Sequence, residues 1–194
     1  MLIRPVMTLV LLASCQGGSS SKQEEPQRTA APAVPTAIEV HDTKGSVTAK
    51  ISADRPCRAN VDGIELIVGT RPVVATVGAV QWTGDDDNGG TLIRRDGEPV
   101  ARLAPGQDTL GLFDPNGVAI VRAMLSNNSV RVVSGQGALL RTATRTSTGI
   151  AVGDQTVTGT DDLLLAAVLA APEARPEVRA LAACLRANPG DRAL

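Results

Sequence analysis

Aromatic residues and histidine are scarce in this sequence, which has one Trp, one Phe, no Tyr and one His among its 194 residues. Because proteins commonly bind bases and sugars by stacking them on aromatic rings, this composition offers almost no platform for either ligand. Any Ser-His-Asp triad would have to use His41, which lies in EVHDTKG beside an expected turn and is interpreted as a solvated surface side chain. The net charge of −1 provides no basic field, so we expect no nucleic-acid partner.

Motifs for cofactor or substrate chemistry are lacking as well. The sequence contains no P-loop, no dinucleotide fingerprint, no nucleophile elbow and no zinc-site spacing. We therefore expect no cofactor and no catalytic constellation, and we interpret the protein as a non-enzyme.

The N-terminus lacks an apolar run long enough to cross a bilayer. MLIRPVMTLVLLAS carries one arginine and an apolar run shorter than the roughly 20 residues of a spanning helix. This pattern predicts a signal peptide over residues 1–14. The four residues LASC that end at Cys15 resemble the lipobox of bacterial lipoproteins.

The lipobox resemblance implies that the Cys15 thiol carries a diacylglycerol, that the chain is cut before it and that the new N-terminus is often acylated. Several acyl chains, each contributing about 0.8 kcal/mol per buried CH₂, give stable anchoring. Gln16 stands where an aspartate would imply retention in the inner membrane, so the resemblance favours the outer membrane in a cell with two. The alternative is an ordinary secretory signal that happens to contain a cysteine.

The lipidated cysteine and a tether are expected over residues 15–36. This segment is mostly Gly, Ser, Gln, Glu, Pro and Ala, and it has too little apolar surface to offset the entropy of ordering it. We therefore predict a disordered linker that joins the membrane-bound lipid to a single β-rich domain over residues 37–194.

Short runs rich in Val, Ile and Thr follow from residue 37, separated by Gly-containing turns at hairpin spacing. The expected turns are HDTKG (41–45), VDG (61–63), RDGE (95–98), DPNG (114–117) and SGQG (134–137). The predicted fold class is mainly β (α+β). We expect an antiparallel β-meander or a barrel-like sheet of repeated hairpins, with two C-terminal helices of which one is buried.

A weak repeat of about 20 residues runs through the middle hairpins. Each unit places a glycine in its turn and a basic residue after it, at Gly97 and Arg102, Gly117 and Arg122, and Gly137 and Arg141. One interpretation is a row of guanidinium groups that binds an anionic headgroup or a carboxylate. The other is that arginine simply solvates the outer face of each hairpin.

The last part of the chain, from about residue 160 to 188, predicts two helices. LLLAAVLAA (163–171) is apolar on every side, which is typical of a helix buried in a core, and Thr160 or Asp161 is placed to cap it. A second, amphipathic helix is expected from about Pro176 to residue 187. Arg179 is expected at the edge of its apolar face.

Two cysteines remain after lipidation of Cys15. Outside the cytoplasm Cys57 and Cys184 are expected to form a disulfide, which would pin the second helix to the early strands. The alternative is a pair of buried free thiols, because the distance between the two Cα atoms is not given by sequence.

The acidic stretch TGDDDNGG places Asp85, Asp86, Asp87 and Asn88 before two glycines. Clusters of carboxylate and amide oxygens can hold Ca²⁺, but the spacing fails as an EF-hand loop in each register. An exposed acidic turn between strands is the preferred interpretation.

The segments RRDGEPVARL, LFDPNGVAIVRA and DDLLLAAVLAA resemble the tubby-like and scramblase-like barrel proteins, in which successive hairpins wrap a hydrophobic helix near the C-terminus. These segments cover less than half of the chain. The resemblance implies a barrel around an apolar helix, binding of anionic lipid headgroups or a membrane-proximal role, and no catalytic residues.

Three functions follow from these observations. The first is a lipid-anchored cell-envelope protein whose β-rich domain binds or scaffolds an envelope protein partner. The second is a carrier of a lipid or small ligand, which requires a barrel interior that the segment 163–171 does not fill. The third is a hydrolase that uses Asp85 to Asp87 or His41.

Overall fold

The computed structural model describes residues 37–52, 54–69 and 73–187, which form fourteen strands and two helices. The strands are β1 (Ala37–His41), β2 (Val47–Ser52), β3 (Cys57–Val61), β4 (Ile64–Val68), β5 (Val73–Val77), β6 (Val80–Asp87), β7 (Gly90–Arg95), β8 (Glu98–Pro105), β9 (Thr109–Phe113), β10 (Ala119–Ser126), β11 (Ser129–Ser134), β12 (Leu139–Thr146), β13 (Gly149–Val152) and β14 (Gln155–Thr158). The helices are α1 (Leu163–Leu169) and α2 (Pro176–Ala187).

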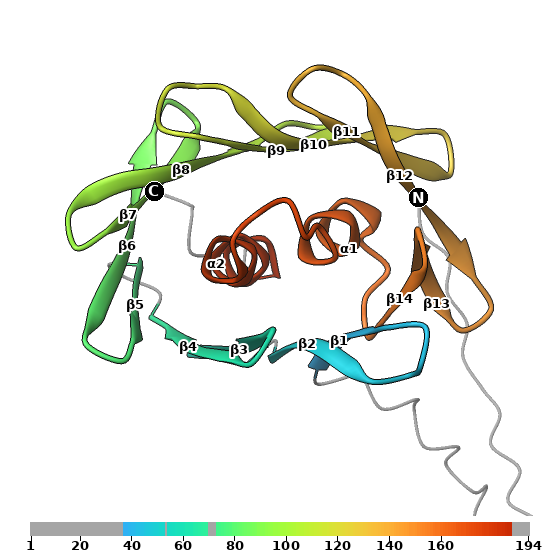
Figure 1. The fold of residues 1–194 in the computed structure, drawn as a ribbon, viewed down its shortest axis with the longest axis horizontal. Coiled ribbons are helices and arrows are strands. Elements are labelled where there is room, and N and C mark those ends of the chain that lie inside the picture. Colours follow the sequence, from blue (N-terminus) through green and yellow to red (C-terminus); the bar gives the residue numbers. More distant parts are fainter. Residues whose placement is uncertain (1–36, 53, 70–72, 188–194) are drawn as a thin grey trace, which may run out of the picture. The chain divides into compact units, whose positions relative to one another are not determined.

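Each strand pairs antiparallel with the next, and β1 also pairs with β14, so the sheet closes into a barrel. The closing register places Val40 opposite Val157. Figure 1 shows the ring of strands around the two helices. The mainly β fold class with two C-terminal helices is therefore confirmed, and the barrel-like alternative is the one the chain adopts.

Alternation of side chains along each strand separates the barrel interior from its outer face. In β8, for example, Ala101 and Leu103 are fully buried inside, while Arg102 between them lies on the outer face. Since consecutive strands run in opposite directions, the turns fall at two ends of the barrel. We call the end at which β1 begins the proximal end and the opposite end, which holds the β1–β2 turn, the distal end.

The five turns expected from the sequence all join consecutive strands, and all lie at the distal end. Asp114 is an example of the expected chemistry, because its Oδ1 accepts hydrogen bonds from the Asn116 amide at 2.9 Å and the Val118 amide at 2.8 Å. Gly117 ends this turn with a φ of 81°, a conformation that glycine adopts without steric cost.

Helix α1 is surrounded by the barrel wall, and each of its side chains is buried, as its sequence predicts. The residue that caps it is Asp162, one or two positions later than expected. Its Oδ1 accepts hydrogen bonds from the Leu164 amide at 3.0 Å and the Leu165 amide at 3.1 Å, while Thr160 accepts from the Asp162 amide instead.

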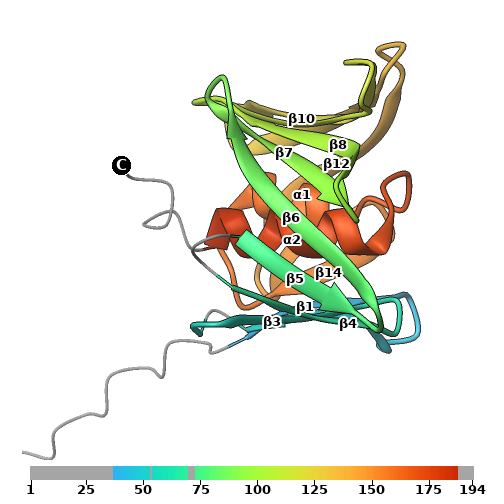
Figure 2. The same cartoon turned by 90° about the vertical axis from the view of Figure 1, so that its left-hand side faces the viewer.

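Helix α2 is more deeply buried than expected, since the sequence predicts only one buried helix. It lies inside the closed barrel beside α1, as Figures 1 and 2 show. Contact with α1 on one side and with β2, β3 and β4 on another buries most of its surface. Arg179, expected at the edge of the apolar face, is consequently only 5% exposed.

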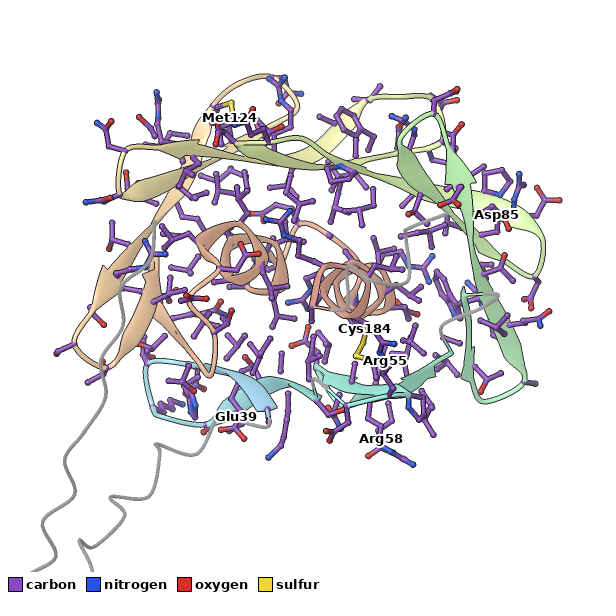
Figure 3. The ribbon with its side chains drawn as sticks, turned by 180° about the vertical axis from the view of Figure 1, so that it is seen from behind. Glu39, Arg55, Arg58, Asp85, Met124 and Cys184 are labelled. Carbon is purple, nitrogen blue, oxygen red and sulfur yellow. A yellow bond between two sulfur atoms is a disulfide. The ribbon has the colours of Figure 1, made fainter. Side chains whose placement is uncertain are left out.

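The expected disulfide between Cys57 and Cys184 is present. The two Cα atoms are 5.9 Å apart, within the usual range for such a bond. It joins the first residue of β3 to the C-terminal half of α2, and Figure 3 shows the bond between the helix and the barrel wall. The barrel wall and its internal helix are thus covalently linked.

Candidate functional site

Cys15, the predicted lipidation site, lies outside the described residues, as do the signal peptide and tether predicted over residues 1–36. None of the helices in the described part of the chain is long and apolar enough to cross a membrane.

The three arginines of the repeat have different surroundings. Arg102 donates from Nε to Asp87 Oδ2 at 2.6 Å on the outer face. Arg141 lies opposite the buried Val132 after a register shift, and therefore faces the barrel interior at its distal end. There it donates to the carbonyl oxygen of Ala170 at 3.1 Å and pairs with Glu173.

Arg122 is the exception among these three. Its exposed side chain makes no hydrogen bond or ion pair within residues 37–52, 54–69 and 73–187. The expected row of guanidinium groups is therefore not formed, because Arg141 follows its turn glycine by four residues rather than five and so faces inward, and because Asp87 binds Arg102. Of these three arginines, Arg122 is the one without a hydrogen-bond or ion-pair partner among the described residues.

The acidic stretch is also divided by the fold. Asp85, Asp86 and Asp87 belong to β6 rather than to a turn, so alternation separates them. Asp85 accepts from Arg94 Nε at 2.9 Å, and Asp87 binds Arg102. Asp86 instead lines a pocket of about 310 Å³ at the proximal end, with Gly89, Gly90 and Thr91.

Asn88 occupies the turn itself, with a φ of 44°, and donates from Nδ2 to Asp87 Oδ1 at 3.2 Å. No group of three or more His, Cys, Asp or Glu side chains within the described residues is arranged to hold a metal ion. The arginine partners of Asp85 and Asp87 already supply the positive charge that a cation would bring.

His41 lies at the end of β1, where its Nε2 is 3.5 Å from Glu39 Oε2 and 3.5 Å from Thr158 Oγ1. The Lys50 ammonium is 2.7 Å from the other Glu39 oxygen. The hydrogen bond from Lys50 lowers the pKa of Glu39, and the charges of Lys50 and His41 act in the same direction. These contacts form a surface ion-pair cluster between β1 and β2.

The interior contains one buried charged side chain among the described residues, Arg179. It pairs with Asp62 in the β3–β4 turn and donates from Nη1 to the Leu169 carbonyl at 3.1 Å. This carbonyl is at the C-terminus of α1, where a positive charge is favourable. We interpret Arg179 as a structural link between the two helices and the distal end of the wall.

A pocket of about 280 Å³ lies on the outer face of β8, β9 and β10. Its lining is mostly apolar and comprises Ala104, Pro105, Gly106, Thr109, Gly111, Phe113, Arg122 and Met124. Figure 3 shows Met124 on the side of the wall that faces away from the helices. The pocket combines the one phenylalanine of the chain with Arg122, which has no partner among the described residues.

Gly111 forms the floor of this outer pocket. A Cβ atom at Gly111 would lie 2.5 Å from Cε2 of Phe113, so the ring covers the glycine closely. Arg122 is directly opposite Gly111 on β10. The absence of a side chain at residue 111 thus leaves room for the ring and for the pocket beside it.

Exposed apolar side chains also lie beside the distal turns that precede β10 and β12. Val118 is 59% exposed, Leu139 is 54% exposed and Leu140 is 37% exposed, although each lies at the start of a strand or next to one. We name the outer face of β8 to β12, with these residues and the pocket at Arg122, the outer apolar face.

A second outer pocket, of about 320 Å³, lies over β2, β3 and β4 and includes Lys50, Arg58, Glu65 and Ile67. Its charges are mixed. Lys50 is engaged with Glu39, and Glu65 accepts from the Asn60 amide group at 3.5 Å. The outer apolar face is therefore the stronger candidate site.

Sequence reasoning identified Arg122 but not the pocket beside it. The signal was present in LGLF (110–113), where a small residue and the single phenylalanine occupy the same face of one strand. Comparison with protein-family models, curated proteins and solved structures finds no match to the chain.

Proposed function

We propose that this protein is a lipid-anchored cell-envelope lipoprotein whose barrel is a binding or scaffolding module. The observation that carries this proposal is the filling of the barrel by its own chain. Helix α1 is buried on every side, and α2 is buried over residues 178–185. A partner would therefore bind to the outer wall or the turns.

The carrier alternative has less support for the same reason. A lipid carried inside the barrel would have to displace a helix that is held by the Cys57–Cys184 disulfide and by the Arg179–Asp62 ion pair. The hydrolase alternative also lacks support, because Asp85 is engaged by an arginine.

The anchor part of the proposal depends on the resemblance of LASC to a lipobox and on where the barrel begins. Strand β1 starts with Ala37 at the proximal end, so an anchor before it joins the barrel there. The distal turns, with the exposed Val118 and Leu139 beside them, are then at the end opposite the attachment point, whereas the pocket at Arg122 extends toward the proximal β8–β9 turn. This placement supports contact with a protein partner of the envelope.

Site-specific photocrosslinking in intact cells tests the proposed function. A photoreactive amino acid replaces Leu139, on the outer apolar face, or Ile67, which is 47% exposed on β4 across the barrel. We expect a discrete protein adduct at Leu139 and a weaker or absent one at Ile67. Absence of adducts from these and other outer positions would refute a binding module.

Native mass spectrometry of the protein purified from its own envelope distinguishes the carrier alternative from the binding module. The expected mass is that of the chain with its covalent lipid alone. A stoichiometric, noncovalent lipid or small molecule, retained after mutation of the outer apolar face, would favour the carrier instead.

A further inference from the structure

The closed sheet restricts how this barrel can bind a partner. Many sheets bind an extended peptide by adding it to a free edge strand, but β1 and β14 pair with each other here. Within the described residues every strand has a partner on both sides, although β4 and β5 share a single register pair, Val68 with Ala75. Side chains and pockets on the outer wall are therefore the main surface for recognition.

The size of the pocket at Arg122 limits its occupant. Its volume of about 280 Å³ is at the lower end for ligand sites, which usually span about 300–1,000 Å³. Such a space holds one apolar side chain and a small polar group, and is too small for a phospholipid with its acyl chains. The apolar walls come from Ala104, Pro105, Phe113 and Met124.

The charge at the pocket specifies the polar group. Six arginines of the described residues form ion pairs with carboxylates, namely Arg94, Arg102, Arg141, Arg175, Arg179 and Arg186. Arg122 has no such partner in this part of the chain. A guanidinium group can donate two parallel hydrogen bonds to a carboxylate, which makes a carboxylate the best complement.

Arg131 adds to the positive potential without lining the pocket. It lies on β11 directly opposite Met124, and it too is exposed and without a hydrogen bond or ion pair among the described residues. Met124 and Arg122 share one face of β10, so Arg131 is a diagonal neighbour of Arg122. The two arginines are similar in charge and exposure, but only Arg122 touches the pocket.

We propose that the outer pocket binds the C-terminus of a partner protein, with the terminal carboxylate on Arg122 and an apolar last side chain against Phe113 and Met124. This inference rests on the proposed binding function and gives it a recognition chemistry. A free C-terminus supplies both groups within one residue. It also binds without adding a strand to the closed sheet.

Phe113 provides a direct probe of this site because it is the one phenylalanine in the chain. Incorporation of 4-fluorophenylalanine therefore gives one fluorine NMR signal from the pocket. The full chain, held in phosphatidylcholine nanodiscs, is titrated with the peptide acetyl-Gly-Ser-Ala-Leu bearing a free carboxylate. The same peptide with a C-terminal amide is the matched ligand control.

We expect the free acid to shift the signal in a saturable way and to bind at least tenfold more tightly than the amide. Arg122→Gln should weaken binding of the acid at least fivefold. Arg131→Gln, which removes the same charge from an adjacent strand, should weaken it less than twofold. A Gly111→Ala variant, which pushes the Phe113 ring into the pocket, should also lose binding while its circular dichroism spectrum is unchanged.

Three results would overturn the inference. They are no saturable shift with the acid, equal affinity for acid and amide, and equal effects of Arg122→Gln and Arg131→Gln, which would indicate diffuse attraction between charges. If acetyl-leucine binds as tightly as the peptide, the natural ligand of the pocket is a small carboxylic acid rather than the C-terminus of a protein. Each leaves the crosslinking test of the binding module intact, so the two proposals fail separately.

Discussion

Removing the Cys57–Cys184 disulfide should lower the free energy of unfolding by about 5 kcal/mol. The two cysteines are 127 residues apart, and closing a loop of that length takes about 16 cal/mol/K of entropy from the unfolded chain. At room temperature this equals about 5 kcal/mol. Since domains are stable by only about 5–15 kcal/mol, the loss is large.

The assay is urea unfolding of Cys57→Ala/Cys184→Ala, followed by circular dichroism in a Cys15→Ala background that removes the remaining thiol. The Cys15→Ala chain is the matched control, because it keeps the disulfide. The Tm should fall by on the order of 10–20 °C, since 1 kcal/mol corresponds to about 2–4 °C at this chain size. An unchanged urea midpoint, or two titratable thiols in the control, would refute the reasoning.

Three further predictions concern the core, the surface ion pair and the anchor. Leu165→Ala should cost about 2–5 kcal/mol in urea unfolding, because it leaves a cavity in a helix buried on every side; a loss below 1 kcal/mol would contradict that packing. Lys50 lowers the pKa of Glu39 in the folded state, so this pair stabilises the fold above the ordinary pKa of glutamate and loses that effect as pH falls from there through the lowered pKa of the folded state. In Glu39→Gln the free energy of unfolding should therefore fall less steeply at acid pH than in the unchanged protein. The same dependence on pH in both proteins would exclude this contribution. Cys15→Ala should move the protein out of the membrane fraction, and unchanged fractionation would refute the lipid anchor.

The repeat of about 20 residues explains why so much of the barrel could be predicted. Two strands and two turns make one period, so glycines one period apart, such as Gly97, Gly117 and Gly137, return to the same end of the barrel. The distal turns carry this clear glycine signal. The proximal turn at Asn127 was not predicted, because a short turn without glycine resembles a continuous strand in sequence.

The inward position of Arg141 was not predicted, although the spacing in the sequence carries the signal. Arg102 and Arg122 follow their turn glycines by five residues and Arg141 follows Gly137 by four, while all three hairpins have a register shift after the turn. Because side chains alternate between the two faces of a strand, the shorter spacing places Arg141 on the inner face. Closure of the sheet was hidden in the sequence, since it depends on pairing between β1 and β14 at opposite ends of the domain sequence.

The number of strands connects the internal helices to the proposed function. A barrel of about eight strands is narrow enough for its own side chains to fill, whereas 16–18 strands leave an aqueous channel. This ring of fourteen strands has mostly Val, Leu, Ile and Ala inside, so it needs additional material in the centre. Helices α1 and α2 supply it.

A chain truncated after Thr158 should consequently lose its cooperative unfolding transition. Inward side chains of the strands that contact α1, such as Val121 on β10 and Ala143 on β12, would then line an unfilled space. The measurement is urea unfolding of the truncated and full chains by circular dichroism, with dye binding to report exposed apolar surface. A cooperative transition in the truncated chain would show that the barrel folds without its helices. The interior would then be open to a ligand, and the argument that partners bind to the outer wall would lose its basis.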